Sequence, residues 1–216
     1  MRTPFSPAAR LSGRPGAETA ALAALVDGNP GELQILLEIL ALTDPFARDA
    51  LAGVRALGSL PRYTGANAAA VMLPFLLRAP SRFSSGRYGV LYGAESTDTA
   101  TAEVRYHHAR RLRAANAASG TMVLLTLWAF VLDCDVVDVR DYDAAIYAPD
   151  TYTAAQALGA RIQANGDAAI LYRSVRRPDG ECVAVLQPAA VTNMEKRDDW
   201  RLVWDGSAIS ETLRVA

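Results

Sequence analysis

The feature that most constrains the fold of this chain is a strongly apolar run between Thr121 and Val139. Its first part reads Val123-Leu124-Leu125-Thr126-Leu127-Trp128, and β-branched and aromatic residues of this kind favour strands. The run therefore predicts one or two strands that are buried inside the protein. No segment of the chain reaches about 18 uninterrupted apolar residues, so we expect no membrane-spanning helix.

Two N-terminal segments differ in character from the rest of the chain. Residues 1–17 are rich in Pro, Gly and Ser, and we expect them to form a flexible N-terminus. Residues 18–57 carry apolar residues at helical spacing, with breaks at Gly28-Asn29-Pro30 and Thr43-Asp44-Pro45. They predict an N-terminal helical extension of two or three packed helices, which ends at Gly58-Ser59.

Residues 58–216 predict a single unit of mixed elements. From Leu60 on, glycines and aromatic residues become frequent, and short strands are expected to begin there. Ser96 or Thr97 is suited to cap a helix that runs to about Ala115. The other predicted elements are strands at Tyr88–Ala94, Ala168–Ser174 and Glu181–Leu186, a helix at Asp150–Ala164, and a hairpin of Arg201–Trp204 with Ala208–Val215. Helices first and mixed elements afterwards indicate the α+β class.

The composition excludes several classes of protein. The 216 residues are 51% apolar and 21% charged, as in an ordinary globular protein, and the formal net charge is −1. Direct binding of nucleic acid favours a basic domain and is not expected. Cys134 and Cys182 are too few for a disulfide scaffold or a cysteine-built zinc site, and with two histidines we expect no metal. The N-terminus lacks the apolar segment of a secretory signal, so we expect a cytoplasmic protein.

Most clusters of polar residues have a simple structural explanation. The sequence has no Walker A, GxGxxG, GxSxG or HExxH motif. His107 and His108 stand beside several arginines and are interpreted as part of a basic helix end rather than as catalytic residues. An acidic cluster lacks the central glycine and the terminal glutamate of a calcium loop, so a solvated strand end or a partner surface is expected. Its members are Asp133, Asp135, Asp138, Asp141 and Asp143.

The most informative stretch runs from Ser81 to Glu103. It contains Arg82 before a glycine turn, a short strand that ends in Tyr92, a capped turn, and a helix that carries Glu103. We expect Arg82 and Glu103 to meet in one cleft. Small and apolar residues flank Glu103, and a carboxylate in such surroundings is either partnered or functional. From the residues alone, a glutamate on the helix surface or an ordinary Arg–Glu pair is an equally good explanation.

This stretch resembles the RES domain, a family named for its Arg, Glu and Ser residues. The positions in register with the family pattern are Arg82-Phe83, Gly86, Leu91-Tyr92, Ser96 and Ala102-Glu103. Arg62-Tyr63, twenty residues before Arg82, matches the first arginine of the family and its aromatic neighbour. Residues 172–176 with Gly180 resemble the segment that carries the family serine, which is Ser174 here. The resemblance covers about residues 60–190 and gives no role to the helices at 18–57.

The resemblance implies a fold and a function. The fold is similar to that of ADP-ribosylating toxins, with a central mixed or antiparallel sheet and flanking helices. The function is that of a toxin in a bacterial toxin–antitoxin system, which cleaves the nicotinamide–ribose bond of NAD. It either degrades NAD or transfers ADP-ribose to a protein. The implied partner is a small Xre-type antitoxin with a helix-turn-helix, in a hetero-oligomer. The alternative is a non-catalytic partner that binds the antitoxin and modulates transcriptional autoregulation.

The resemblance also assigns roles to individual residues. Cleavage of the nicotinamide–ribose bond develops positive charge on the ribose, and a fixed carboxylate stabilises such a charge. Glu103 is the expected carboxylate, with Arg82 and Ser174 beside it as catalytic residues. We expect Ser174 to orient the substrate rather than attack it, because no base is evident next to it.

The expected binding residues for NAD complete this site, which needs no metal. Arg62 and Arg82 are the expected anchors for the pyrophosphate, because the planar arginine fork suits phosphate oxygens. Tyr63 and Tyr92 are expected to stack on nicotinamide or adenine, each with a hydroxyl to spare. Ser174 is expected to hydrogen-bond a ribose or the carboxamide.

Overall fold

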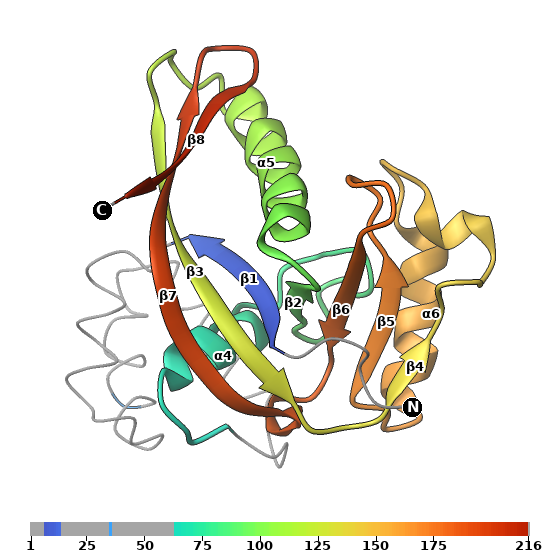
Figure 1. The fold of residues 1–216 in the computed structure, drawn as a ribbon. Helices are drawn as coiled ribbons and strands as arrows, with labels where there is room; N and C mark the ends of the chain where they lie inside the picture. Colours follow the sequence, from blue (N-terminus) through green and yellow to red (C-terminus); the bar gives the residue numbers. More distant parts are fainter. Residues whose placement is uncertain (1–6, 14–34, 36–62, 216) are drawn as a thin grey trace.

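A computed structural model describes residues 7–13, 35 and 63–215 (Figure 1). Apart from Ile35, the helical extension predicted at 18–57 lies outside the described residues, and so does the candidate Arg62. The described part forms one eight-stranded sheet with the strand order β4-β5-β6-β2-β1-β3-β7-β8. β4 and β5 are parallel, and the other neighbouring strands are antiparallel.

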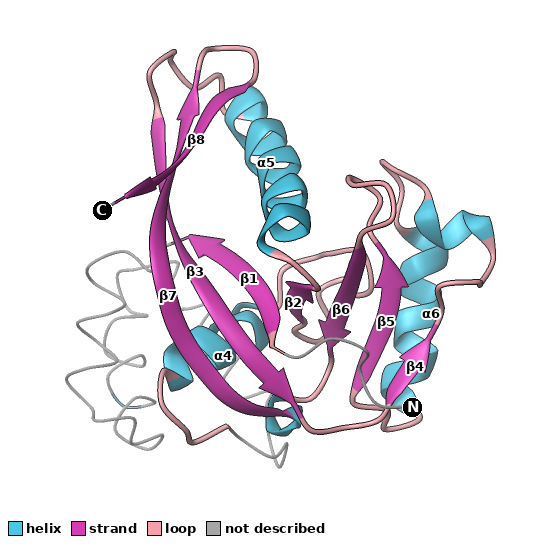
Figure 2. Cartoon of the chain, viewed as in Figure 1, coloured by secondary structure: helices cyan, strands magenta, loops and turns pink. Residues whose placement is uncertain are grey.

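Strands and helices are interspersed along the described part of the chain, and the mostly antiparallel sheet is typical of an α+β protein (Figure 2). The strands are β1 (Ala8–Gly13), β2 (Leu91–Ala94), β3 (Met122–Leu132), β4 (Val136–Asp138), β5 (Ala169–Arg173), β6 (Glu181–Val185), β7 (Val191–Trp204) and β8 (Ile209–Val215). The helices are α4 (Ala68–Leu77), α5 (Thr97–Ala114) and α6 (Thr153–Ala164), with 3-10 turns η1 (Ala144–Tyr147) and η2 (Pro188–Ala190). The predicted class, a central mixed sheet with flanking helices, is confirmed.

The sheet carries a separate hydrophobic cluster on each face. Side chains alternate between the two faces of a strand, so Ile170 and Tyr172 of β5 lie on one face while Ala169 and Leu171 lie on the other. The first face packs against α5 and α6, and the second packs against α4. Predicted site residues on opposite faces of the sheet therefore cannot contact one another.

The N-terminal strand β1 lies in the middle of the sheet. Ala9 pairs with Ala94 of β2, and on the other side β1 pairs with β3 from Ala8↔Phe130 to Gly13↔Leu125. The expectation of a flexible N-terminus is therefore wrong for Ala8–Gly13. Its composition indicated mobility, but the strand is held by partners that are distant in sequence, which local composition does not reveal.

Helix α4 replaces the short strands that were expected soon after Leu60. Its sequence is AAAVMLPFLL, and Pro74 inside it removes one backbone donor, which weakens a helix. Val71 and Phe75, four residues apart, lie on one side of the helix and are buried in the second cluster. This packing against the sheet explains a helix whose local signals are mixed.

The other predicted elements agree with the structure. Ser96 caps α5, because its Oγ accepts a hydrogen bond from the Thr99 amide at 3.2 Å. The apolar run at 121–139 forms β3 and β4, and the C-terminal hairpin turns at Asp205-Gly206. The strand before this turn is longer than predicted, since β7 begins at Val191. Among the described residues, no helix is both long and apolar enough to span a membrane.

Gly159 allows α6 to approach the segment that carries Arg82. A Cβ at Gly159 would lie 2.1 Å from the carbonyl oxygen of Phe83, which is backbone and has little room to move. Gly159→Ala is therefore expected to lower the free energy of unfolding by about 1–3 kcal/mol. Chemical unfolding followed by circular dichroism measures this effect. Gly13→Ala is the control, because nothing lies within 4 Å of the added Cβ. Equal stability of the two variants would contradict the close approach.

Candidate active site

Helix α5 brings Glu103 to the loop that follows β5, where Ser174 lies. The Ser174 hydroxyl donates a hydrogen bond to Glu103 Oε1 at 2.7 Å, and the Val175 amide donates to the same oxygen at 3.2 Å. Ser174 Oγ also accepts hydrogen bonds from the amides of Arg176 and Arg177, each at 3.1 Å. One carboxylate oxygen of Glu103 is thus fixed, and the structure brings together two residues that the sequence singled out.

The second oxygen of Glu103 lies near a histidine of the same helix. Glu103 Oε2 lies 3.9 Å from His107 Nε2, one helical turn further along α5, and 21% of the Glu103 side chain is exposed. Burial lowers the pKa of His107 below its ordinary value more strongly than the Glu103 charge raises it. His107 is therefore neutral near pH 7, and the Glu103 charge is not neutralised by it.

Arg82 is buried beside this site and holds the loop around η1. Its Nη1 donates to the carbonyl oxygens of Ile146 at 2.8 Å and Ala148 at 3.1 Å, and its guanidinium carbon lies 4.7 Å from the centre of the Tyr152 ring. Both hydrogen bonds use Nη1, and among the described residues Nε and Nη2 have no hydrogen-bond acceptor. Arg82 thus has a positioning role that the sequence did not predict.

The charges of Arg82 and Glu103 both act on Tyr172. Arg82 and Glu103 make no hydrogen bond or ion pair with each other. Burial raises the pKa of Tyr172 well above its ordinary value, the Glu103 charge raises it further, and the Arg82 charge opposes this. Both charges therefore act on the same buried hydroxyl. That Arg82 and Glu103 meet in one cleft stays a prediction.

Tyr92 lies under the segment that carries Arg82. Its hydroxyl accepts a hydrogen bond from the Phe83 amide at 3.1 Å and donates one to Ser81 Oγ at 2.8 Å. Burial raises the pKa of Tyr92 to about 12. The hydroxyl is thus used inside the protein, so the expectation of a spare hydroxyl at Tyr92 is wrong. The ring meets Tyr172 edge to face at 6.5 Å.

Tyr63 lies on the opposite face of the sheet from Glu103. It is buried in the cluster around Val71 and Phe75, and its hydroxyl donates a hydrogen bond to the Ala66 carbonyl at 3.0 Å. The structure therefore does not bring Tyr63 to the other candidate residues. Its aromatic ring serves the core under the sheet, and the expectation that it also has a hydroxyl to spare is wrong.

The position of Tyr63 gives a direct test. Tyr63→Phe removes only a hydroxyl that bonds to its own turn. For the NAD binding that the resemblance implies, the affinity is therefore expected to change by less than about 2-fold, while the free energy of unfolding falls by about 1 kcal/mol. Affinity is measured by calorimetry in a Glu103→Gln background, in which the implied cleavage of NAD is expected to be slowed. A loss of affinity comparable to that of an Arg82 variant would place Tyr63 back in the site.

Two residues at the edge of the site were missed by the sequence interpretation. The Arg176 guanidinium stacks on the Tyr106 ring at 3.3 Å, and Arg176 donates a hydrogen bond to the Pro149 carbonyl. The Tyr106 hydroxyl donates to Asp150 Oδ1 at 2.6 Å. A signal for Tyr106 existed, because it follows Glu103 by three residues and so lies on the same side of α5.

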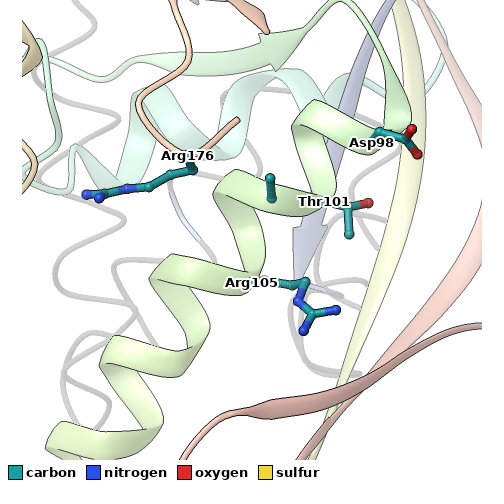
Figure 3. A pocket seen from close by; sticks show the side chains of 5 residues that line it. Asp98, Thr101, Arg105 and Arg176 are labelled. Carbon is teal, nitrogen blue, oxygen red and sulfur yellow. The ribbon is translucent and has the colours of Figure 1, made fainter. Parts of the chain in front are cut away.

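Two hollows border the segment Ser174–Arg176. One, of about 460 Å³, lies along α5 and is shown in Figure 3; it is lined by Asp98, Thr101, Ala102, Arg105 and Arg176. The other, also of about 460 Å³, is lined by Arg140, Asp141, Tyr142, Ala144, Tyr147, Arg173, Ser174 and Val175. Arg176 thus lines the first hollow, and Ser174 lines the second.

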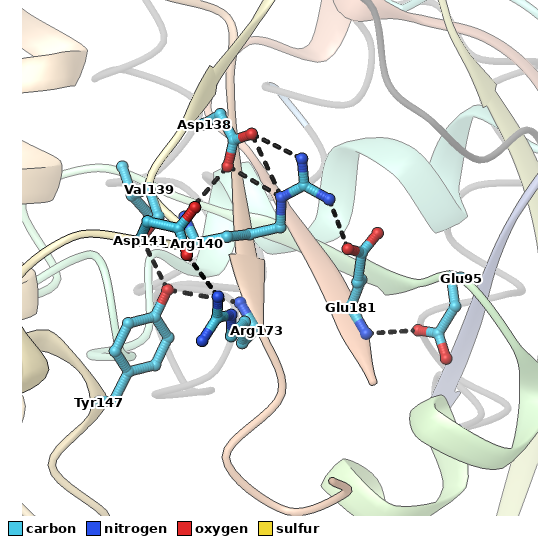
Figure 4. Close-up of polar contacts among 8 residues, drawn as sticks. All are labelled: Glu95, Asp138, Val139, Arg140, Asp141, Tyr147, Arg173 and Glu181. Carbon is cyan, nitrogen blue, oxygen red and sulfur yellow. Dashed lines mark hydrogen bonds and ion pairs between the residues drawn. The ribbon is translucent and has the colours of Figure 1, made fainter. Parts of the chain in front are cut away.

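Three members of the acidic cluster are engaged in local contacts. Asp138 pairs with Arg140 at 2.7 Å, and Asp141 pairs with Arg173, as Figure 4 shows. Asp143 caps η1 by accepting a hydrogen bond from the Ala145 amide at 2.8 Å. Within the described ranges no group of His, Cys, Asp and Glu residues is arranged to hold a metal ion.

The fold and this arrangement define an α+β domain with a helix carboxylate held by the serine at a strand end. Residues 54–205 match the family model described as the RES domain. The chain belongs to the RES domain family, and the resemblance predicted from the sequence is confirmed.

Comparison with individual proteins adds one distant similarity. The chain is similar to a chain in the crystal structure of the M. tuberculosis MbcT–MbcA toxin–antitoxin complex, with a TM-score of 0.44 and 15% sequence identity. The similarity covers 58% of this chain and 73% of that chain. No curated protein matches the sequence.

Proposed function

We propose that this protein is the toxin of a toxin–antitoxin pair and that it cleaves the nicotinamide–ribose bond of NAD. The observation that carries the proposal is the state of Glu103. One oxygen is fixed by Ser174 and Val175, while the other makes no hydrogen bond to any described residue and lies 3.9 Å from a neutral histidine. A carboxylate held in this way keeps its charge in one place, as stabilisation of a positively charged sugar requires.

The proposed reaction needs few groups from the protein. The bond from the ribose C1′ to the nicotinamide nitrogen breaks, its electron pair leaves with nicotinamide, and positive charge develops on the ribose. Glu103 Oε2 stabilises that charge, and Ser174 keeps the carboxylate in place rather than attacking. An acceptor then bonds to C1′ and loses a proton. The acceptor is water, phosphate or a nucleophilic group of a protein.

Arg82 is the proposed anchor for the pyrophosphate of NAD. Its Nη1 is engaged by the Ile146 and Ala148 carbonyls, which fixes the plane of the guanidinium. The edge formed by Nε and Nη2 carries N–H groups that can donate hydrogen bonds to phosphate oxygens. Arg62 is proposed as a second anchor on the strength of the family pattern alone.

The proposed partner is an Xre-type antitoxin with a helix-turn-helix, as membership of the family implies, and the proposed location is the cytoplasm. Induction of the wild-type protein without the antitoxin is expected to arrest growth. Induction of Glu103→Gln to the same level is expected to allow growth, since cleavage of NAD is the proposed cause of toxicity. Growth arrest by both proteins would show that toxicity does not depend on Glu103.

The reaction is tested by turnover of NAD labelled in the nicotinamide or in the adenylate. The purified protein is assayed in phosphate buffer, in phosphate-free buffer, and with cell lysate. Release of nicotinamide without labelled protein identifies degradation, and a dependence on phosphate identifies phosphorolysis. Adenylate label on a lysate protein identifies ADP-ribose transfer. No turnover in any condition would favour the non-catalytic partner that binds the antitoxin.

A further inference from the structure

Glu95 lies at the junction between β2 and α5, and both of its carboxylate oxygens are engaged. Oε1 accepts hydrogen bonds from Thr99 Oγ1 at 2.6 Å and from Ser96 Oγ at 2.9 Å. Oε2 accepts a hydrogen bond from the Glu181 amide at 2.9 Å, drawn in Figure 4. The Glu95 amide in turn donates to the Glu181 carbonyl at 3.1 Å. One side chain thus ties the first turn of α5 to the first residue of β6.

Two sets of contacts connect this junction to the proposed active site. On one side, Thr99 belongs to the helix that carries Glu103, four residues further along. On the other side, Gly180 precedes Glu181, and its carbonyl accepts a hydrogen bond from the Ser174 amide at 2.7 Å. Thr99 and Gly180 are in close contact, since a Cβ at Gly180 would lie 2.9 Å from Thr99 Oγ1.

We propose that Glu95 is a positioning residue for the reaction proposed above, which this inference presupposes. It sets the relative placement of α5 and of the loop between β5 and β6, and thereby the contact of Glu103 with Ser174. A carboxylate suits this junction because it accepts hydrogen bonds on both oxygens and its charge strengthens them. Glutamine at this position keeps the Glu181 amide on its oxygen only if its NH₂ group donates to the Thr99 and Ser96 hydroxyls, which reverses these two hydrogen bonds and leaves all three contacts without the charge.

The test compares Glu95→Gln with a matched variant of Glu181. Glu95→Gln and Glu95→Ala are expected to lower kcat for NAD cleavage by about 10-fold to 100-fold, because small displacements of reacting groups are costly. KM for NAD is expected to stay within about 2-fold, since no group that contacts the substrate is removed. Glu181→Ala loses the ion pair with Arg140 but keeps the backbone amide that Glu95 binds, so its kcat is expected to stay near wild type.

A second readout does not depend on the reaction. Hydrogen exchange at the Glu181 amide is expected to become at least about 10-fold faster in Glu95→Gln than in Glu181→Ala. Thermal unfolding of the three variants shows whether a change in kcat simply follows a loss of stability. If Glu95→Ala does not fold, Glu95→Gln carries the comparison.

The outcomes separate this inference from the proposed function. Wild-type protein that cleaves NAD, with unchanged kcat in Glu95→Gln, would overturn the positioning role alone. The positioning role would also be overturned if Glu181→Ala lowered kcat as well and the loss of kcat in each variant followed its loss in unfolding temperature. Wild-type protein without NAD cleavage would overturn the proposed function. In that case, unchanged exchange of the Glu181 amide in Glu95→Gln would overturn the placement by Glu95 too.

Discussion

Glu103→Gln is expected to lower kcat for NAD cleavage by about 100-fold to 10,000-fold while the protein keeps its fold. The substitution retains an oxygen that can accept the hydrogen bonds of Ser174 and Val175, and it removes the negative charge at the second oxygen. Stabilisation of a positively charged ribose is therefore lost although the local packing is preserved. Release of labelled nicotinamide measures kcat, and circular dichroism monitors the fold.

A surface glutamate provides the control for this substitution. Glu195 pairs with Arg197 at 2.9 Å and is exposed, so Glu195→Gln removes a charge of the same kind away from the site. Its kcat is expected to remain within about 2-fold of wild type. Full activity in Glu103→Gln would remove Glu103 from the catalytic role, and inactivity in both variants would point to a defect common to both proteins.

Substitution of Arg82 is expected to damage both stability and NAD binding, and two variants separate these effects. Arg82→Ala leaves the Ile146 and Ala148 carbonyls without their donor, which costs about 2–4 kcal/mol of unfolding free energy. It is also expected to weaken NAD binding by more than about 10-fold. Arg82→Lys keeps a charged donor for the carbonyls and recovers part of the stability, but it lacks the second edge of the guanidinium.

The measurements are chemical unfolding and NAD binding in a Glu103→Gln background. Arg82→Lys with recovered stability and weak binding supports the anchor role, whereas recovery of both would reduce Arg82 to a structural residue. Arg197→Ala is the control because its pair with Glu195 lies at the surface. It is expected to change either quantity by less than about 2-fold or 0.5 kcal/mol.

The elements that the sequence predicted are those with strong local signals. The cap at Ser96, the apolar run at 121–139 and the turn at Asp205-Gly206 each specify a structure through neighbouring residues. Strand β1 and helix α4 lack such signals. β1 is held by strands far along the chain, and α4 is stabilised by burial of Val71 and Phe75 against the sheet. Local composition contains neither kind of information.

The family pattern predicted which residues form the candidate site, because it fixes their spacing along the sequence. Glu103 and Ser174 are far apart in sequence, yet the family pattern placed both in the site, and the structure joins them by a hydrogen bond that the pattern did not predict. The pattern could not show on which face of the sheet a residue lies. Tyr63 was therefore expected in the site although it packs on the opposite face. It also could not show that the Tyr92 hydroxyl is used internally.

Because β1 lies in the middle of the sheet, the sheet can form around it only after strands far along the chain have been translated. Ala8 of β1 is translated long before its partner Phe130, because β2, α5 and most of β3 lie between them in the sequence. Contacts between such distant residues form late and slow the folding of a domain. An incomplete translation product that ends before β3 contains Glu103 but no partner for most of β1, and it lacks Ser174 altogether. Under the proposed function, such a fragment is therefore expected to be harmless, and consumption of NAD begins only after Ser174 and the partner strands of β1 have been translated.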